Sequence, residues 1–169
     1  DPGTWRHAGI DPDDVDVLHV PFYSLALEPI ASTATAVVEW AHERSVAVSV
    51  DLSSIALLEA LGERAVLAQL ERLRPTVVFA NADEAALLGI TGPVVDAMTF
   101  VKRGPAPATV FTSNGELSIA ATSIGDVDDT TGAGDAFAAG VLTHGDWQHD
   151  ARGACEAGHE SAAALFAAR

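Results

Sequence analysis

Small and acidic residues stand directly before a helix-forming run near the carboxyl end. Residues 128–142 read Asp-Asp-Thr-Thr-Gly-Ala-Gly-Asp-Ala-Phe-Ala-Ala-Gly-Val-Leu. The first N–H groups of a helix lack intrahelical partners and lie at the positive end of its dipole, so Gly-Ala-Gly there makes a pocket for an anion. Asp135 would repel a permanent anion. The two features fit together if the anion is transient and the carboxylate takes a proton from the group that attacks it.

This combination predicts phosphoryl transfer, which needs backbone donors for the spreading charge and a carboxylate that orients the nucleophile. The alternative is an ordinary helix start whose small residues allow close packing. Other phosphate and hydrolase patterns are missing from the sequence: Gly-x-x-x-x-Gly-Lys, Gly-x-Gly-x-x-Gly after a strand, and Gly-x-Ser-x-Gly. His159-Glu160 lacks the second histidine of a zinc-protease helix.

A second polar group follows an apolar strand at Asn81-Ala-Asp-Glu84. A carboxylate one helical turn from an amide can hold a hydrated Mg²⁺, which prefers oxygen ligands and keeps its waters. The alternative is that Asn81 caps a helix and Glu84 is a solvated first-turn acid. Lys102 ends another apolar run, where a lysine is ordinarily only solvated.

The elements that must position these residues alternate in type. Nearly continuous apolar strands separated by helices predict a parallel sheet covered on both faces. The expected strands span 14–20, 46–51 and 76–80, and the helices between and after them span 28–44, 53–73 and 81–89. Short strands are expected next at 98–102, 108–112 and 117–121, followed by helices over 134–144 and 150–169.

Three segments in order resemble the ribokinase-like (PfkB) carbohydrate and nucleoside kinases. The glycine motif, from Asp129 through Gly132-Ala-Gly-Asp135 to Gly140-Val-Leu, resembles the second signature of that family. The segment Asn81 to Glu84 is similar to its Asn-x-x-Glu motif, and residues 100–104 resemble the strand and turn that line the nucleotide. The sequence differs from many relatives at Asp51, where these carry Asp-x-Asn followed by a basic residue.

The resemblance implies a fold and an extent. The fold is a three-layer α/β/α ribokinase-like fold with a mostly parallel central sheet. Residues 15–169 correspond to the carboxyl-terminal part of such kinases, with the amino-terminal part and its β-stranded lid missing. Residues 1–169 are therefore expected to be a single, partial kinase domain. Because the missing part carries most acceptor-binding residues, we expect this fragment alone to be inactive.

The resemblance also assigns roles to particular residues. Asp135 would be the catalytic base, and the N–H groups of Gly132, Ala133 and Gly134 would hold the transferring phosphoryl group. Asn81 and Glu84 would organise Mg²⁺, while Lys102, Gly104 and His159 would lie at the ATP site. Asp129 and Thr131 would offer oxygens to an activating monovalent cation such as K⁺.

The predicted function is transfer of the γ-phosphoryl group of ATP to a hydroxyl of a sugar. A nucleoside kinase of the same family is one alternative. Another is a truncated, non-catalytic module that binds nucleotide or a protein partner. The sequence upstream of residue 1 would separate enzyme from module.

Composition bounds the remaining possibilities. The formal charge of -15 disfavours nucleic acid, which attracts basic proteins. Cys155 is the single cysteine and cannot form an internal disulfide, and charges or prolines interrupt every apolar run, so we expect a cytoplasmic protein that does not enter a membrane. A sheet without its amino-terminal strands would expose an apolar edge, which makes a homodimer possible.

Overall fold

The computed structural model describes residues 9, 11, 14–123 and 129–167. Asp128 of the glycine motif and the last two residues of the final expected helix lie outside the described residues. Within the described part, six strands form one sheet in the order β1-β2-β3-β4-β5-β6. The strands are β1 (Val17–Pro21), β2 (Ala47–Asp51), β3 (Val77–Asn81), β4 (Met98–Lys102), β5 (Ala108–Thr112) and β6 (Gly115–Ile119).

The first four strands are parallel, and β5 and β6 continue the sheet antiparallel. Buried, mostly apolar residues in β2, β3 and β4 explain this arrangement, because a parallel sheet needs cover on both faces. The expectation of a mostly parallel central sheet is confirmed.

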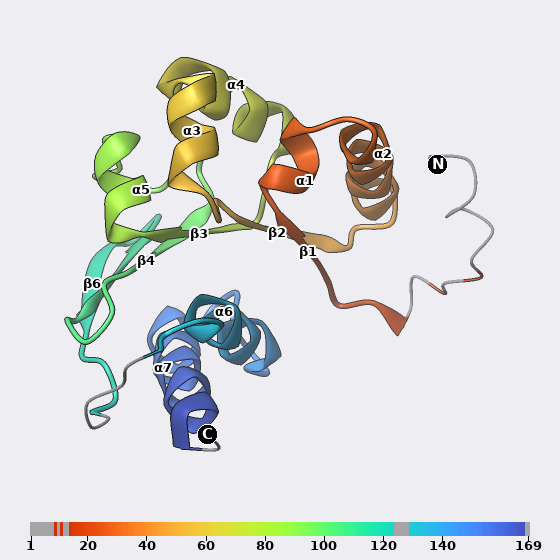
Figure 1. Ribbon diagram of the computed structural model, residues 1–169. Helices are drawn as coiled ribbons and strands as arrows, with labels where there is room; N and C mark the ends of the chain where they lie inside the picture. The colour runs from red at the N-terminus through yellow and green to blue at the C-terminus, as the bar shows by residue number, and fades with distance from the viewer. Residues whose placement is uncertain (1–8, 10, 12–13, 124–128, 168–169) are drawn as a thin grey trace.

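Helices form a layer on each face of the sheet (Figure 1). Because crossovers between parallel strands are right-handed, a strand order that runs in one direction places its connecting helices on one face. That layer holds α1 (Tyr23–Ala26), α2 (Ile30–Glu43), α3 (Ile55–Leu61), α4 (Glu63–Leu73) and α5 (Ala82–Leu87). The opposite layer holds α6 (Ala133–Thr143) and α7 (Ala151–Ala167), and a separate apolar core lies on each side of the sheet.

Several element boundaries differ from the sequence expectations. The helix expected over 53–73 is two helices, because Gly62 adopts a φ of +80°, outside the helical region, and ends α3 before α4 begins. The strand expected at 14–20 starts at Val17, since the N–H of Asp14 donates to the carbonyl of Asp11 in a turn, 3.1 Å away. The short helix α1 was not predicted.

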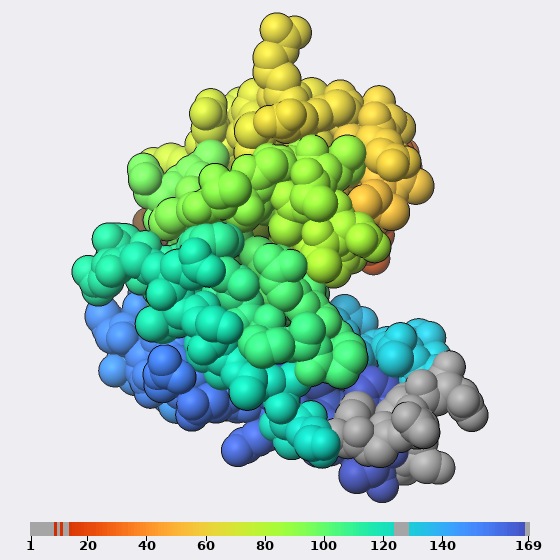
Figure 2. All heavy atoms as spheres, turned by 90° about the vertical axis from the view of Figure 1, so that its left-hand side faces the viewer, coloured from red at the N-terminus to blue at the C-terminus, as the bar shows by residue number. Residues whose placement is uncertain are grey.

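Small residues set how closely α6 and α7 pack. A Cβ at Gly140 would overlap the backbone carbonyl of Ala157 and the side chain of Ser161. A Cβ at Gly158 would lie 2.9 Å from the ring of Phe137. The close packing fixes the start of α6 below the carboxyl ends of the strands, and Figure 2 shows a hollow between the upper layer and that start.

Within the described residues, no helix has both the length and the apolar character needed to cross a bilayer.

Candidate active site

The polar residues of the site lie where parallel strands end and α6 begins. Asp51 is the last residue of β2 and pairs in register with Phe79 of β3. Lys102 is the last residue of β4 and pairs with Asn81 of β3. Because side chains alternate between the faces of a strand, register decides which side chains meet. It places a carboxylate and an ammonium on the α6 side of the sheet, two strands apart.

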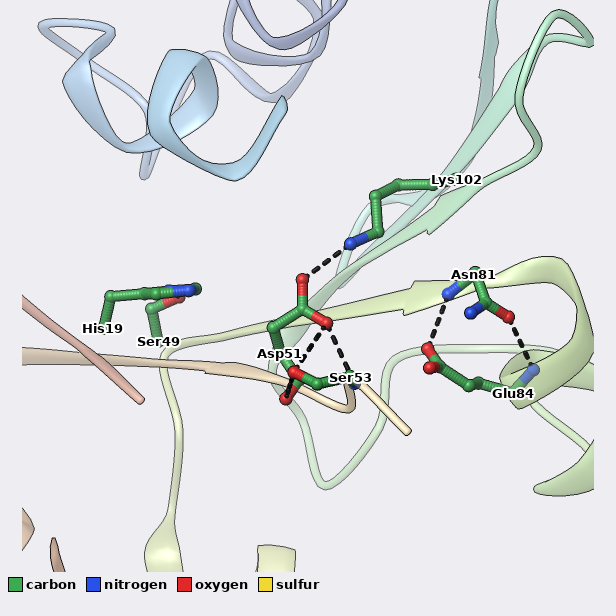
Figure 3. A network of polar contacts seen from close by, with 7 residues as sticks. All are labelled: His19, Ser49, Asp51, Ser53, Asn81, Glu84 and Lys102. Atoms are coloured by element: carbon green, nitrogen blue, oxygen red, sulfur yellow. Dashed lines mark hydrogen bonds and ion pairs between the residues drawn. The ribbon is translucent and has the colours of Figure 1, made fainter. Parts of the chain in front are cut away.

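Lys102 reaches across β3 to Asp51 (Figure 3). Its Nζ lies 2.6 Å from Oδ2 of Asp51 and 5.8 Å from the ring centre of Phe79. The Asp51 side chain is 9% exposed and that of Lys102 is 16% exposed. Charge-assisted hydrogen bonds of this length are among the stronger ones, and burial limits screening by water. The sequence alone assigns Lys102 no side-chain partner and Asp51 no role.

The second oxygen of Asp51 is held by its own chain. Oδ1 accepts a hydrogen bond from the backbone N–H of Ser53 at 3.0 Å. The Ser53 hydroxyl lies 2.8 Å from the backbone carbonyl oxygen of Asp51 and 3.3 Å from Oδ1, so its one proton is donated mainly to the carbonyl. Ser53 adopts a φ of +59°, which costs a non-glycine residue free energy and persists only when surrounding contacts hold it. The Asp51 carboxylate is thus fixed from one side and presents its other oxygen to Lys102.

The glycine motif starts α6 next to this ion pair. Gly132 is the residue before the helix and has a φ of +82°, where a side chain would be strained. A Cβ on Gly134 would lie 3.2 Å from Nζ of Lys102, so the ammonium occupies space that a side chain would crowd. Asp135 is exposed in the first turn. The start of α6, a lysine and a carboxylate are therefore brought together.

Two other residues of this motif already have partners. The N–H of Ala133 donates to the carbonyl of Thr130 at 3.1 Å, so it closes a turn. The N–H of Thr131 donates to Oδ1 of Asp129 at 2.9 Å. The N–H of Ala133 is one of the three assigned to the anion pocket. It must therefore break its bond to Thr130 before it can donate to an anion.

Asn81 and Glu84 form a reciprocal helix cap. Oδ1 of Asn81 accepts from the N–H of Glu84 at 2.9 Å, and Oε2 of Glu84 accepts from the N–H of Asn81 at 2.8 Å. The capping alternative is therefore present, yet Glu84 is only 2% exposed and is not a solvated acid. Its burial raises its pKa, the Asn81 N–H bond lowers it, and the charge of Asp51 raises it.

A histidine that sequence reasoning missed lies beside these groups. Nδ1 of His19 is 2.9 Å from the hydroxyl of Ser49, and its ring packs edge-on against Phe79 at 6.2 Å. Burial lowers the pKa of His19, while the charges of Asp51 and Asp135 raise it and that of Lys102 lowers it. The signal available in the sequence was the position of His19 near the end of an apolar strand.

In the described part of the chain, two residues assigned to the ATP site make no recorded contact with the Asp51–Lys102 pair. Gly104 is exposed in the turn between β4 and β5. His159 is 8% exposed, and its ring packs edge-on against Phe137 of α6 at 5.1 Å. Within the described residues, Nε2 of His159 is buried and has no hydrogen-bond partner. Burial lowers the pKa of His159, and a hydrogen bond with the backbone of Ile119 raises it.

Metal-binding residues do not gather densely. Across the part of the chain that the structure describes, no three His, Cys, Asp or Glu side chains are close enough to form a metal site by themselves. Glu84 fits a hydrated Mg²⁺ better than Asn81 does. Its cap uses only Oε2, whereas Oδ1 of Asn81 is taken by the N–H of Glu84.

Comparison with known proteins identifies the family. The model of the pfkB family of carbohydrate kinases matches residues 28–168. No curated protein sequence matches the chain.

Solved structures show the same fold. Adenosine kinase from Sinorhizobium meliloti is 20% identical with a TM-score of 0.75, over 94% of this chain and 54% of that protein. Aminoimidazole riboside kinase from Salmonella enterica, in complex with aminoimidazole riboside and an ATP analog, is 21% identical with a TM-score of 0.71, over 93% of this chain and 60% of that protein. Fructokinase from Vibrio cholerae is 22% identical with a TM-score of 0.70, over 94% of this chain and 62% of that protein.

The chain thus spans between half and two thirds of the length of these three kinases. Their likeness confirms the ribokinase-like α/β fold of the corresponding part. The family match covers most of the sequence and includes the glycine motif, the Asn81 turn and the Lys102 strand. The chain therefore belongs to the pfkB family of carbohydrate kinases.

Proposed function

We propose that the chain is the nucleotide-binding and catalytic part of an ATP-dependent kinase that phosphorylates a hydroxyl of a sugar. The observation that carries this proposal is the position of Lys102, whose ammonium lies 3.2 Å from where a Cβ of Gly134 would be, at the first turn of α6. An ammonium, a helix start and the nearby Asp135 carboxylate are the groups that a transferring phosphoryl group and its nucleophile require.

The proposed reaction uses these groups together. Asp135 accepts the proton of the acceptor hydroxyl while the oxygen of that hydroxyl forms a bond to the γ-phosphorus of ATP. The bond from that phosphorus to the bridging oxygen breaks, and ADP leaves. The N–H groups of Gly132 and Gly134 hold the phosphoryl oxygens, and that of Ala133 joins them once it releases Thr130.

Metal ions would complete the charge balance. Bound Mg²⁺ supplies positive charge that neutralises the phosphates. Oε1 of Glu84 would accept hydrogen bonds from the waters around Mg²⁺, and Asn81 would orient Glu84 through the helix cap. Asp129 and Thr131 remain the proposed oxygen ligands of a monovalent cation. Lys102 and Gly104 would face the ATP phosphates, and we keep His159 only as a residue packed behind α6.

A sugar is the first proposed acceptor, because the family match is to carbohydrate kinases and fructokinase is among the similar structures. A nucleoside is the second, because adenosine kinase and aminoimidazole riboside kinase are similar at about the same level. The proposed domain is residues 1–169, as part of a longer kinase fold.

A coupled assay of ADP formation tests the proposal. The complete protein would be incubated with Mg·ATP and a panel of sugars and nucleosides. ADP release that depends on a sugar supports the first acceptor, and release that depends on a nucleoside supports the second. Nucleotide binding without release for any acceptor would favour the non-catalytic module.

A further inference from the structure

We propose that Asp51 is a positioning residue for phosphoryl transfer, which acts by holding the ammonium of Lys102 at the start of α6. This inference rests on the proposed function, because it assumes that the terminal phosphoryl group of ATP reaches that start. It assigns a role to a carboxylate that neither the glycine motif nor the Asn81 turn includes.

The length and flexibility of the Lys102 side chain explain why an ion-pair partner is required to hold its ammonium in place. A lysine side chain is long and flexible, and holding it in one conformation costs rotamer entropy. Its Nζ lies 5.8 Å from the ring centre of Phe79 and 2.6 Å from Oδ2 of Asp51. Without the carboxylate, nothing else in these contacts would direct the ammonium toward β2 and α6.

Asp51 is suited to this task because it is itself immobile. The backbone N–H of Ser53 donates to Oδ1, the Ser53 hydroxyl donates to the backbone carbonyl of Asp51, and Oδ2 is left for the ammonium. Ser53 holds a φ of +59° to make them. Strain of this kind persists where neighbouring contacts enforce it and is concentrated at functional sites.

Gly134 sets the other side of the ammonium. A Cβ there would lie 3.2 Å from Nζ, closer than ordinary van der Waals contact, so a side chain at this position would crowd the ammonium. The ammonium is thus bounded by Asp51 and by the first turn of α6. An ammonium has three N–H donors, so Lys102 can keep its bond to Asp51 while it donates another to a phosphoryl oxygen.

A double-mutant cycle in the complete protein tests whether Asp51 acts through Lys102. We expect Asp51→Asn to lower kcat by about 10- to 100-fold with the KM for ATP within about threefold, because a misplaced ammonium stabilises the transition state less. Lys102→Met should lower kcat further. In the Lys102→Met background, Asp51→Asn should have no added effect beyond about twofold. Additive losses, or a raised Mg²⁺ requirement in that background, would overturn the proposal and make Asp51 a metal-site residue instead.

Asp150→Asn is the matched control. Asp150 also pairs with a basic side chain, that of His144, and accepts a backbone N–H, that of Gly153, but it lies at the start of α7. This variant should leave kcat unchanged, so a loss confined to Asp51→Asn is specific to the site.

A second measurement does not need an acceptor. The 169-residue sequence contains one lysine, so lysine labelled at Cε gives one side-chain NMR signal. We expect Asp51→Asn to move this signal in the chain without nucleotide. A non-hydrolysable ATP analogue with Mg²⁺ should shift the wild-type signal more than Mg·ADP does. If Asp51→Asn leaves the lysine signal unchanged, Asp51 does not position Lys102. If both nucleotides shift the signal equally, Lys102 does not contact the terminal phosphate.

The two tests separate this inference from the proposed function. If no acceptor supports ADP formation and no nucleotide binds, the proposed function fails. If Asp51→Asn still moves the lysine signal in that case, Asp51 positions Lys102, but Lys102 does not bind a phosphoryl group.

Discussion

Glu84 joins a helix cap to a proposed metal-binding role in one buried carboxylate. It closes the helix cap with Asn81 through Oε2, and it lies near the charges of Asp51 and Lys102. A raised pKa means that the ionised form is less favourable in the folded protein than in water. Burial therefore disfavours the charge of Glu84 in the folded chain, and the proposed hydrated Mg²⁺ would favour it.

Replacing Glu84 by glutamine separates these tasks. Gln can still accept the N–H of Asn81, so the free energy of unfolding at pH 7 should change by no more than about 1 kcal/mol. The Mg²⁺ concentration for half-maximal activity should rise, because an amide holds a hydrated cation less well. Magnesium titrations and thermal melts check both. An unchanged Mg²⁺ requirement together with a lower Tm would restrict Glu84 to its cap.

His159 should make stability depend on pH. Its pKa in the folded protein is lowered from the ordinary value of 6.5, so the unfolded chain binds the proton more tightly. The stabilisation is complete above pH 6.5 and is lost as the pH falls from there toward the lower folded pKa. Thermal melts of the wild type should show this loss between about pH 6.5 and about pH 5.5, a window of about one unit below the ordinary histidine pKa.

The variant His159→Asn should lose less stability over the same range, since Asn does not titrate. Some loss should remain, because burial also lowers the pKa of His19. His149→Asn is the control, since the His149 side chain is 81% exposed. The stability of this variant should depend on pH in the same way as that of the wild type. Equal acid sensitivity of His159→Asn and wild type would contradict the account of the buried ring.

At the scale of elements, the packing of α6 on α7 helps to place the proposed anion pocket. Gly140 and Gly158 are at the contact, and the start of α6 is seven residues before Gly140. A change in their packing would therefore move the pocket relative to Lys102.

Gly140→Ala tests this packing. Alanine is the better helix former by about 1 kcal/mol, yet its Cβ would overlap the carbonyl of Ala157. We expect the overlap to dominate and to lower the free energy of unfolding by about 1–3 kcal/mol. Gly145→Ala is the control, because a Cβ there meets no atom within 4 Å. Chemical denaturation measures both, and a more stable Gly140→Ala protein would show that α6 and α7 are packed more loosely.

The sequence predicted local features better than boundaries and distant pairs. The apolar strands at 98–102 and 108–112 were placed correctly, because their length and flanking Gly and Pro residues define them locally. The break at Gly62 was missed, since the apolar periodicity continues on both sides of it. Asn81 and Glu84 are neighbours in sequence, so their contact was foreseeable.

The central contact of the site was not foreseeable in the same way. Asp51 and Lys102 are 51 residues apart, and His19 and Ser49 are 30 apart. The first contact depends on the register of β2, β3 and β4, and the second on that of β1 and β2, which a single sequence does not specify by itself. The N–H bond of Ala133 to Thr130 likewise depends on the turn that the chain adopts before α6.

At the scale of the whole molecule, acceptor binding and nucleotide binding are expected to separate. Within the described residues β1 pairs only with β2, so one side of the sheet ends in an open edge. Tyr23, Leu27 and Ile30 nearby in sequence are exposed apolar residues. Such an edge favours association with another chain, and we keep a homodimer as a proposal.

The 169-residue chain alone should bind Mg·ATP weakly and phosphorylate no sugar. The proposed phosphate-binding groups lie within it, but water is not excluded and no acceptor is positioned. Calorimetry and the coupled assay would measure binding and turnover, with sedimentation reporting association. Sugar-dependent ADP release from this chain would contradict the prediction and show that the acceptor site is present.

The most direct test of the proposed kinase chemistry is Asp135→Asn in the complete protein. The substitution keeps the size of the side chain at an exposed position of α6 and removes the proposed base. With the acceptor found in the panel, kcat should fall by about 10²- to 10⁴-fold, while calorimetry should give an affinity for Mg·ATP within a few-fold of wild type. Wild-type turnover in Asp135→Asn would contradict the account and leave the Gly-Ala-Gly turn as a structural helix start.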